Sequence, residues 1–496
     1  MSDRKFIISI DLGTTGNRVF CFDVNGRIIS NSYREFTQYF PHPGWVEHDA
    51  LEIWDSIATL IPEAIKNGDL NPGNVISIGI TNQRETAVLW DSESGKPIYN
   101  AIVWQCRRTA EICNQLKERG YDTAFREKTG LLLDPYFSGT KIKWIFDNVI
   151  DARPLSKNGR LKFGTIDTWI LWKLTGGKVH ATDYTNASRT IIFDIKEKTW
   201  SAELCEILDV PLGILPEVKP SAHPFGKTLG VASLPDGILI GGIAGDQQAA
   251  MVGQGCVLPG TTKNTYGTGC FMLLNNGSDY IISKHGLLTT LTPDNKGEPV
   301  YALEGSVFIG GAVMQWLRDY MKFFTSASES EGMATSIFNK DDEVVFVPAF
   351  VGLGAPYWDM NVRGAVFGLT RDTTREQIVR AALKSIAFQS MDVIKAMEQD
   401  TMKTITELRV DGGATENRFL MQFQSDILGV PVLIPEIRES TALGAAYLTG
   451  LTSGLYSTID EIAKGNKIVE RFEPVMNNIE RDRQNNLWKN RVAKLL

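Results

Sequence analysis

Several features that often reveal a function are missing from this 496-residue chain. Its six cysteines are scattered without a CxxC pair, which indicates reduced thiols rather than a disulfide framework in a chain of this length. The five histidines do not fall at metal-ligand spacing, so no zinc site is predicted. No apolar run approaches the roughly 20 residues of a membrane-spanning helix, so no membrane span is predicted either.

An excess of positive charge is also missing. The net charge is −7 at pH 7, which argues against nucleic-acid binding as the main purpose but leaves room for a locally positive anion site. The first residues carry charges before only five uninterrupted strand-like residues, so we expect no signal peptide and a cytoplasmic protein. The GxxxxGK[ST], GxGxxG, HRD and DFG signatures do not occur, which excludes P-loop, Rossmann and protein-kinase nucleotide sites.

What is present is an alternation of strand-like and helix-like segments. Residues 5–11, 18–24 and 26–36 predict three strands in an antiparallel meander. A helix is predicted over residues 49–65, and residues 75–83 predict a buried strand. Three strands, a helix and another strand form an α/β order.

Two helix starts carry capping signals. Asp49 is a candidate N-cap of the first helix, with Glu52 completing a capping box. Thr373 and Glu376 predict the same arrangement at the start of a long helix in the second half of the chain.

The second half of the chain repeats the order of predicted strands, turns and helices found in the first half. A stretch rich in glycine at residues 252–276 precedes new strands and contains the turn "TYGTGC", and residues 405–428 again read as strand, glycine turn and helix. We therefore predict two similar α/β domains, residues 1–253 and 254–496, with a cleft between them.

The first candidate site is the turn in "ISIDLGTTGNRVF". An ordinary hairpin explains an acid and glycines there. The alternative is a phosphate site, because glycine lets the backbone approach a phosphate and hydroxyl groups can donate to its oxygens. The residues available for this are Asp11, Gly13, Thr14, Thr15 and Asn17. The carboxylate of Asp11 suits Mg²⁺, which prefers carboxylates and keeps most of its waters.

A second turn, Gly267-Thr268-Gly269, offers similar donors from the other half of the chain. One such turn is weak support for a phosphate site. Two turns in matching places of two halves favour a nucleotide phosphate held between the domains.

A polyol site is the hypothesis for a third group of residues. Arg84 and Glu85 in "NQRET" follow a buried strand, and on their own they are more simply explained as a surface ion pair. Trp104 and Tyr136 follow comparable short apolar stretches, although any single aromatic residue is more often part of a core. Together, the charged pair can donate to and accept from hydroxyl groups, while the rings cover C–H faces.

The stretch "GGIAGDQQAA" places Asp246 at the end of an apolar strand. The residue could serve only as a helix N-cap. In an α/β fold it also points into the ligand crevice at the carboxyl end of the strand. There its carboxylate could accept a hydroxyl proton during phosphoryl transfer.

With these residues in view, the chain closely resembles the carbohydrate kinase family with an actin-like (ribonuclease H-like) ATPase fold, and within it the members that phosphorylate glycerol. The resemblance runs over nearly the whole chain. It rests on long motifs, among them "PGWVEHD", "GITNQRET", "AIVWQCRRTAEIC", "DPYFSGTKIKWI", "TDYTNASRT", "GIAGDQQAA", "KNTYGTGCFML", "VPAFVGLGAPYWD" and "DGGATENRFLMQFQSDILG".

The resemblance implies a role for each matching position. The implied glycerol site consists of Arg84, Glu85, Trp104, Tyr136, Asp246, Gln247 and Phe271. The implied ATP contacts are Thr14, Thr15, Arg18, Thr268, Gly311, Gln315, Gly413 and Asn417. Asp246 is implied as the general base, and Asp11 with Asp246 as the residues that hold Mg²⁺. The first domain would carry the glycerol site and first phosphate turn, and the second domain the second turn and the adenosine site.

The implied reaction is the transfer of phosphate from MgATP to glycerol, giving sn-glycerol 3-phosphate and ADP, the first step of glycerol catabolism. Family analogy also implies a homodimer or homotetramer. The alternatives are a kinase of the same fold that acts on another polyol or a sugar such as xylulose, an actin-like ATPase without a small acceptor, and a kinase-like regulator. The presence of Asp11 and Asp246 disfavours the regulator.

The sequence departs from the family pattern in the first turn and at one position of a later helix. The first turn usually reads DQGTTSSR, whereas Gly16 and Asn17 replace its two serines here. We expect Asn17 to donate to phosphate in their place, with at most an altered affinity for ATP. Lys384 stands where the family prefers an acidic or amide residue, and we expect it at the surface.

Overall fold

The computed structural model describes residues 4–232, 234–337 and 343–496. Residues 1–3 lie outside these ranges, and they belong to the segment from which no signal peptide is predicted. Within the described ranges, no helix is long and apolar enough to cross a membrane. All six cysteines are buried and free.

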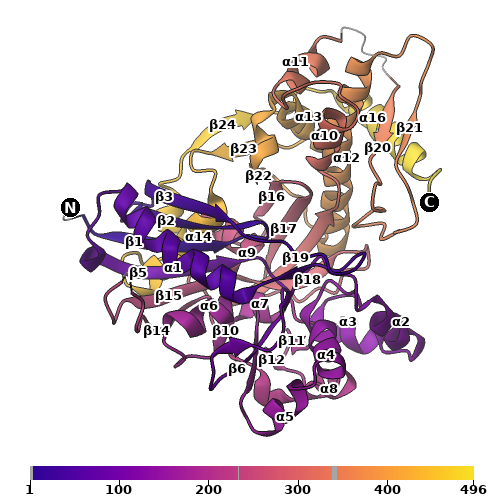
Figure 1. The fold of residues 1–496 in the computed structure, drawn as a ribbon. Coiled ribbons are helices and arrows are strands. Elements are labelled where there is room, and N and C mark those ends of the chain that lie inside the picture. The colour runs from indigo at the N-terminus through magenta and orange to yellow at the C-terminus, as the bar shows by residue number, and fades with distance from the viewer. Residues whose placement is uncertain (1–3, 233, 338–342) are drawn as a thin grey trace.

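The first half of the chain is built around a six-stranded sheet in the order β14-β15-β5-β1-β2-β3 (Figure 1). Its strands are β1 (Phe6–Leu12), β2 (Gly16–Asp23), β3 (Ile28–Glu35), β5 (Val75–Asn82), β14 (Ala222–Lys227) and β15 (Leu239–Gly245). The first three strands form the predicted antiparallel meander, and β1, β5 and β15 run parallel. Parallel strands end at the same edge of a sheet, so the residues after β1, β5 and β15 are brought together.

Both faces of this sheet are covered, as the alternation along β1 shows. Phe6, Ile8 and Ile10 pack into a core with helices α1 (Ala50–Asn67) and α6 (Ile166–Leu174). Ile7 packs on the opposite face against α14 (Ser440–Thr452), where the Ser9 hydroxyl donates to the Ala442 carbonyl at 2.7 Å. Because successive side chains of a strand point to opposite faces of the sheet, neighbouring residues of β1 lie in two different cores.

The second half holds a seven-stranded sheet in the order β18-β19-β17-β16-β22-β23-β24. Its strands are β16 (Thr262–Tyr266), β17 (Cys270–Gly277), β18 (Leu288–Pro293), β19 (Pro299–Val307), β22 (Leu408–Asp411), β23 (Val432–Pro435) and β24 (Ile468–Phe472). The order β19-β17-β16-β22-β23 repeats the order β3-β2-β1-β5-β15, with an antiparallel meander beside parallel strands. The prediction of two similar α/β halves is confirmed.

Helix α14 lies late in the chain but packs on the first sheet and on α9 (Asp246–Gly253). This close contact requires two glycines. A Cβ atom on Gly444 would stand 1.8 Å from the Ala249 carbonyl oxygen, and one on Gly253 would stand 2.0 Å from the Ser440 carbonyl oxygen. The packing of α14 therefore crosses the predicted division at residue 253.

Several of the remaining helices form an additional lobe on the first half, and others pack around the second sheet. Figure 1 shows α12 running along the second sheet and α2 to α5 beside the first half. The bounds are α2 (Ala110–Glu118), α3 (Asp122–Thr129), α4 (Ser138–Asn148), α5 (Ala152–Lys157), α7 (Tyr184–Ala187), α8 (Ala202–Ile207), α10 (Ala312–Asp319), α11 (Glu329–Thr335), α12 (Arg375–Thr401), α13 (Arg418–Leu428), α15 (Ile459–Ala463) and α16 (Asn478–Val492).

The shorter strands are β4 (Glu47–His48), β6 (Val88–Asp91), β7 (Lys96–Pro97), β8 (Ala101–Ile102), β9 (Leu161–Gly164), β10 (Ala181–Asp183), β11 (Phe193–Asp194), β12 (Thr199–Trp200), β13 (Glu217–Lys219), β20 (Val345–Val347) and β21 (Ala365–Phe367). The lobe formed by α2 to α5 and α8 shares one hydrophobic core with β6 and β9. This lobe contributes two aromatic residues of the predicted polyol site.

The capping predictions are partly wrong. Asp49 caps α1 by accepting from the Leu51 N–H at 2.8 Å, but the Glu52 carboxylate accepts from the backbone and hydroxyl of Thr37 instead of closing a capping box. At α12 a capping box is present one residue later than predicted, between Thr374 and Gln377.

The surface position expected for Lys384 is also wrong. Its side chain is 7% exposed, and its ammonium group lies 5.3 Å from the ring centroid of Phe423. The lysine thus lies in the interface between α12 and α13, where its stem is covered by neighbouring side chains.

Candidate active site

The first predicted phosphate turn connects β1 to β2. The Gly13 N–H donates to the Gly16 carbonyl at 3.1 Å, which closes the turn. Thr15 is exposed at its tip, and Thr14 is half-buried. Arg18 follows on β2, where its side chain is exposed and forms an ion pair with Glu439 at 3.0 Å. The turn therefore presents backbone groups, one hydroxyl and one guanidinium group to solvent.

Asn17 does not take part in this surface, and its predicted role as a phosphate donor is wrong. Its side chain is fully buried and donates to the Ser56 hydroxyl on α1 at 3.1 Å. The alternation along β2 explains this, because residue 18 points to solvent and residue 17 therefore points inward. The adjacent Gly16 leaves room for the ring of Tyr33, which lies 2.7 Å from the position of a Cβ atom there.

A buried hydrogen-bond network supports the turn from behind. The Gln83 side chain donates to the Gly13 carbonyl at 3.0 Å, and the Gln38 side chain donates to the Thr14 carbonyl at 3.1 Å. His48 joins the two glutamines, with its Nε2 2.8 Å from Gln38 Oε1 and its Nδ1 3.4 Å from Gln83 Nε2. Burial lowers the pKa of His48 to about 4, so the imidazole is neutral at pH 7.

The second predicted phosphate turn lies between β16 and β17, where Gly267 and Thr268 are exposed. The Thr268 carbonyl accepts from the backbone N–H groups of Gly310 and Ala312, which brings the start of α10 against the turn. A Cβ atom on Gly311 would stand 2.7 Å from the Gly267 carbonyl oxygen, so only glycine allows this approach.

The other residues predicted to contact ATP lie in the second half. Gln315 is exposed on α10, and Gly413 is exposed in the turn after β22. Asn417 caps α13 by accepting from the Leu420 N–H at 2.9 Å, and its amide donates to the Ser330 hydroxyl at 3.2 Å. The oxygen and the nitrogen of the Asn417 side chain are therefore both used in hydrogen bonds within the protein.

The predicted polyol residues Arg84 and Glu85 form an unusual turn after β5. The Thr86 N–H donates to the Arg84 carbonyl at 2.8 Å, with Glu85 between them at φ 62°. A non-glycine residue in this left-handed region is strained and persists only where its surroundings hold it. Both side chains are buried, so the explanation as a surface ion pair is wrong.

Arg84 and Glu85 belong to a buried cluster of two arginines and two glutamates. Arg84 binds Glu304 of β19 through two hydrogen bonds of 2.6 and 3.1 Å. Arg189 donates to Glu85 at 2.5 Å and lies 3.2 Å from a Glu304 oxygen. Burial opposes the ionisation of Glu304, but the two guanidinium groups outweigh it and lower its pKa to about 2. Burial raises the pKa of Glu85, against the attraction of Arg189 and Arg84.

The aromatic residues Trp104 and Tyr136 contact each other edge to face, with ring centroids 5.5 Å apart. Arg189 lies 5.5 Å from the ring of Tyr136, which places this ring beside the charged cluster. The Trp104 indole N–H donates to the Thr14 hydroxyl at 3.0 Å. This hydrogen bond joins the predicted polyol site directly to the first phosphate turn.

Asp246 is the first residue of α9, and Gly245 occupies the N-cap position, so the N-cap explanation of Asp246 is wrong. Its carboxylate forms an ion pair with Arg84, with Nε 3.2 Å from the nearer oxygen, and accepts from the Gln247 N–H at 2.7 Å. The side chain is one-third exposed, so it is both oriented by Arg84 and open to a ligand.

Lys263 of β16 is a buried residue beside Asp246 that sequence reasoning missed. It donates to the Gln247 side chain at 2.5 Å and to the Thr265 hydroxyl at 2.9 Å. Burial lowers its pKa to about 8, and nearby carboxylates, Asp411 first among them, oppose that shift. Phe271 is paired with Thr265 across the sheet and so lies on the same face.

Asp11 and Asp246 interact electrostatically. Burial raises the pKa of Asp11 to about 7, and the Arg18 guanidinium opposes this shift. The charges of Asp246 and Glu439 raise that pKa further. In the described part of the chain, no group of three or more His, Cys, Asp or Glu side chains is arranged to hold a metal ion.

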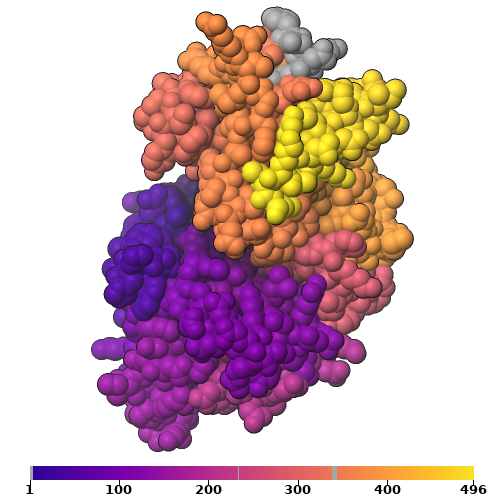
Figure 2. Space-filling view, turned by 90° about the vertical axis from the view of Figure 1, so that its right-hand side faces the viewer, coloured from indigo at the N-terminus to yellow at the C-terminus, as the bar shows by residue number. Residues whose placement is uncertain are grey.

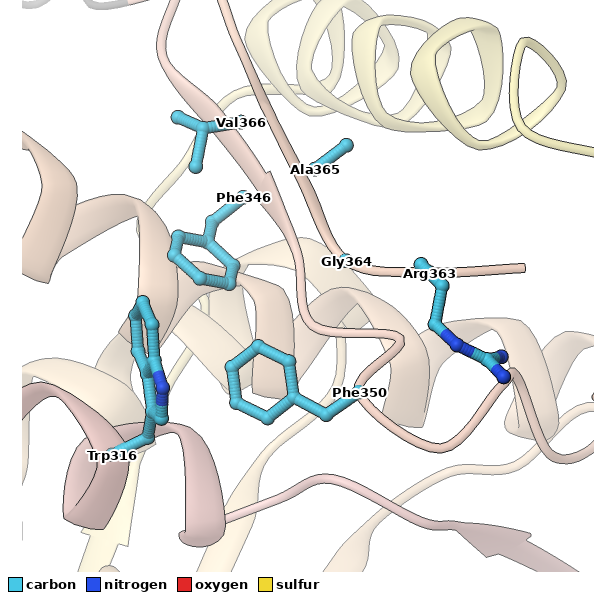
Figure 3. Close-up of a pocket in the computed structure, with 7 residues that line it drawn as sticks. All are labelled: Trp316, Phe346, Phe350, Arg363, Gly364, Ala365 and Val366. Carbon is cyan, nitrogen blue, oxygen red and sulfur yellow. The ribbon is translucent and has the colours of Figure 1, made fainter. Parts of the chain in front are cut away.

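A cavity in the second half of the chain does not coincide with this site. It has a volume of about 500 Å³ and lies between α10 and the β20–β21 hairpin (Figure 3). Trp316, Phe346 and Phe350 line it, with Arg363 at its edge. None of the predicted site residues lines it. Figure 2 shows the surface hollowed between the indigo N-terminal segment and the orange part of the second half.

The family is shown by matches over most of the chain. Residues 6–253 match the N-terminal domain, and residues 262–453 the C-terminal domain, of the FGGY family of carbohydrate kinases. The chain therefore belongs to this family, and the resemblance inferred from its motifs is confirmed.

Individual members of the family can also be compared with this chain. The chain is 56% identical to a glycerol kinase of Leptospira biflexa over 100% of its own length and 99% of the relative, and 54% identical to glycerol kinase 2 of Thermotoga maritima, covering 99% of both chains. It is also similar to the crystal structure of Plasmodium falciparum glycerol kinase with ADP, with a TM-score of 0.93 and 36% identity, covering 99% of this chain and 98% of the other. These matches confirm the two-domain kinase fold.

Proposed function

We propose that this protein transfers the γ-phosphoryl group of ATP to glycerol, giving sn-glycerol 3-phosphate and ADP. The observation that carries the proposal is the arrangement at the ends of β5 and β15, where Arg84 and Glu85 lie beside the partly open carboxylate of Asp246. The 54–56% identity to glycerol kinases over the whole chain supports the choice of substrate.

In this proposal, the glycerol hydroxyl groups are bound by Arg84 and Glu85, while Trp104, Tyr136 and Phe271 cover the carbon chain. Gln247 completes the polar wall next to Asp246. A site built to pair each hydroxyl with a charged group favours a small polyol, because an acceptor that lacks a hydroxyl leaves a buried charge unpaired.

Asp246 acts as the general base. Its carboxylate takes the proton of the reacting hydroxyl as that oxygen bonds to the γ-phosphorus and the bond to the β-phosphate oxygen breaks. The charged guanidinium group of Arg84 holds the carboxylate in position for this transfer. The leaving group is ADP, so atoms and charges balance without a further reactant.

ATP is placed with its phosphates between the two turns, where Thr14, Thr15, Arg18 and Thr268 provide donors. Gly311, Gln315, Gly413 and Asn417 lie on the side proposed for the adenosine.

Mg²⁺ fits the two carboxylates of Asp11 and Asp246, because it keeps waters and phosphate oxygens at its other positions. When bound, Mg²⁺ neutralises negative charge on the phosphates. The two halves of the chain exclude water from the transfer if they close around the substrates.

The decisive experiment measures ADP release with MgATP and a panel of acceptors: glycerol, dihydroxyacetone, xylulose, ribulose and none. We expect a rate that requires glycerol and saturates with it. A preference for a pentulose would overturn the choice of substrate but keep phosphoryl transfer. A rate independent of any acceptor would overturn the kinase proposal in favour of an ATPase.

We also propose a cytoplasmic homodimer or homotetramer, by analogy with the family. Sedimentation velocity of the purified protein at several concentrations tests the assembly. A monomer at every concentration would contradict it.

A further inference from the structure

A buried lysine outside the predicted site contacts two residues inside it. Lys141 lies on α4, and its side chain is fully buried. Its ammonium group donates to the Glu85 carbonyl at 3.1 Å and to the Tyr136 carbonyl at 2.5 Å. These two carbonyls are 51 positions apart in the chain, and one side chain joins them.

The contact is made where the backbone is strained. Glu85 has a φ of 62°, which non-glycine residues rarely adopt. Its carbonyl also accepts from the Ser138 hydroxyl, at 3.0 Å, on the first turn of the same helix. Two donors from α4 therefore hold the conformation that directs the side chains of Arg84 and Glu85 into the cluster.

The chemistry of a buried ammonium group explains why these bonds are strong. A charged donor makes shorter and stronger hydrogen bonds than a neutral one, and without acceptors it would be very costly to bury. Burial lowers the pKa of Lys141 to about 7, although Glu85, Cys106, Asp134 and Cys113 all favour its charged form. An apolar residue would be easier to bury at this position, but it could not donate to the two carbonyls.

We propose that Lys141 is a positioning residue for the acceptor substrate, which fixes Glu85 and Tyr136 relative to each other through their backbone carbonyls. This inference rests on the proposed function, because it assigns these two residues to the acceptor site. Lys141 itself does not touch the reacting atoms. Its loss should therefore weaken acceptor binding more than it slows the chemical step.

The test is a comparison of steady-state constants for wild type, Lys141→Met and Ser138→Ala. For Lys141→Met we expect the KM for glycerol to rise by roughly 10- to 100-fold, as the loss of hydrogen bonds to a charged group predicts. The kcat should stay within about threefold and the KM for ATP should not change, because the reacting groups remain in place. Ser138→Ala removes one neutral donor to the same carbonyl and should raise the KM for glycerol by roughly two- to tenfold.

Lys143→Met is the matched control, since Lys143 lies on the same helix and pairs only with Asp147 among its charged neighbours within 4 Å in the described structure. Its constants should equal those of wild type. An unchanged KM for glycerol in Lys141→Met, or in Ser138→Ala if Lys141→Met does not fold, would overturn the inference. If wild type proves to use another acceptor, the proposed function fails, and the same variants test Lys141 with that acceptor.

Discussion

Arg84 and Glu304 form a two-bonded ion pair that connects the two sheets of the molecule, at 2.6 and 3.1 Å. Arg84 follows β5 of the first sheet, and Glu304 lies on β19 of the second. Both side chains are buried, so solvent does not screen their charges. The same pair that joins the two halves also orients the base proposed for catalysis.

Replacing Glu304 should therefore destabilise the protein strongly. In Glu304→Gln, Arg84 and Arg189 keep their charges but lose the carboxylate between them, and breaking a buried pair on one side costs about 3–5 kcal/mol. Urea denaturation at pH 7 measures the change in the free energy of unfolding. Glu63→Gln is the control, because it breaks the surface pair with Arg34 and should cost about 1 kcal/mol or less. Equal effects in the two variants would contradict the structural role of Glu304.

Trp104 should affect both substrates, because it lies in the predicted polyol wall and donates to Thr14. Trp104→Phe keeps a ring but loses that hydrogen bond, so we expect the KM for ATP to rise by roughly two- to tenfold with a smaller change for glycerol. Trp104→Ala also removes the ring and should mainly raise the KM for glycerol. Trp200→Phe, which loses an N–H bond to the Pro216 carbonyl, is the control and should change neither constant. If both Trp104 variants alter only glycerol, the link to the phosphate turn has no effect on nucleotide binding.

The positions of the candidate turns were predictable because their signals are local. A glycine and a hydroxyl residue after an apolar run mark a strand end, and the carboxyl ends of parallel strands meet at one edge of a sheet. Asp11, Arg84 and Asp246 could be placed at the ends of β1, β5 and β15 on this basis. Which ligand contacts each of them remains a prediction.

The partners of these residues could not be predicted in the same way. Glu304 and Lys263 are each a single charge in a strand, which was an available signal, but their partners Arg84 and Gln247 lie 220 and 16 positions away. Sequence spacing alone does not reveal which charges meet across two sheets.

Local patterns also failed where two neighbouring choices were equivalent. The pairs Thr373–Glu376 and Thr374–Gln377 have the same spacing, and the backbone at the start of α12 selects the second. The prediction for Asn17 is wrong for a different reason: the exposed side chain of Arg18 places its neighbour Asn17 on the opposite, buried face of β2.

His48 should make the stability of the protein depend on pH. Its pKa is about 4 in the folded state and near 6.5 in an unfolded chain. As the pH falls from 6.5 to 4, the unfolded state takes up a proton first, so the folded state loses up to about 3 kcal/mol from this group. The stability of wild type relative to His48→Gln should decline by about that amount over this range. Urea denaturation at pH 8, 5.5 and 4.5 measures it, with pH 8 as the reference at which the imidazole is neutral in both states. A difference between the two proteins that does not vary with pH would contradict the prediction.

Asp246→Asn should separate binding from chemistry. The amide has nearly the same size and its oxygen can still accept from the Gln247 N–H, so the site should keep its shape and glycerol binding should stay within about tenfold of wild type. The amide cannot take up the hydroxyl proton, so kcat should fall by at least roughly 10²-fold. Asp55→Asn, an exposed position on α1, is the control and should leave both constants unchanged. Isothermal titration with glycerol and coupled ADP release measure the two quantities. A variant that turns over at a near-normal rate would remove Asp246 from the role of base, and one that no longer binds glycerol would show that its charge is needed to hold the substrate.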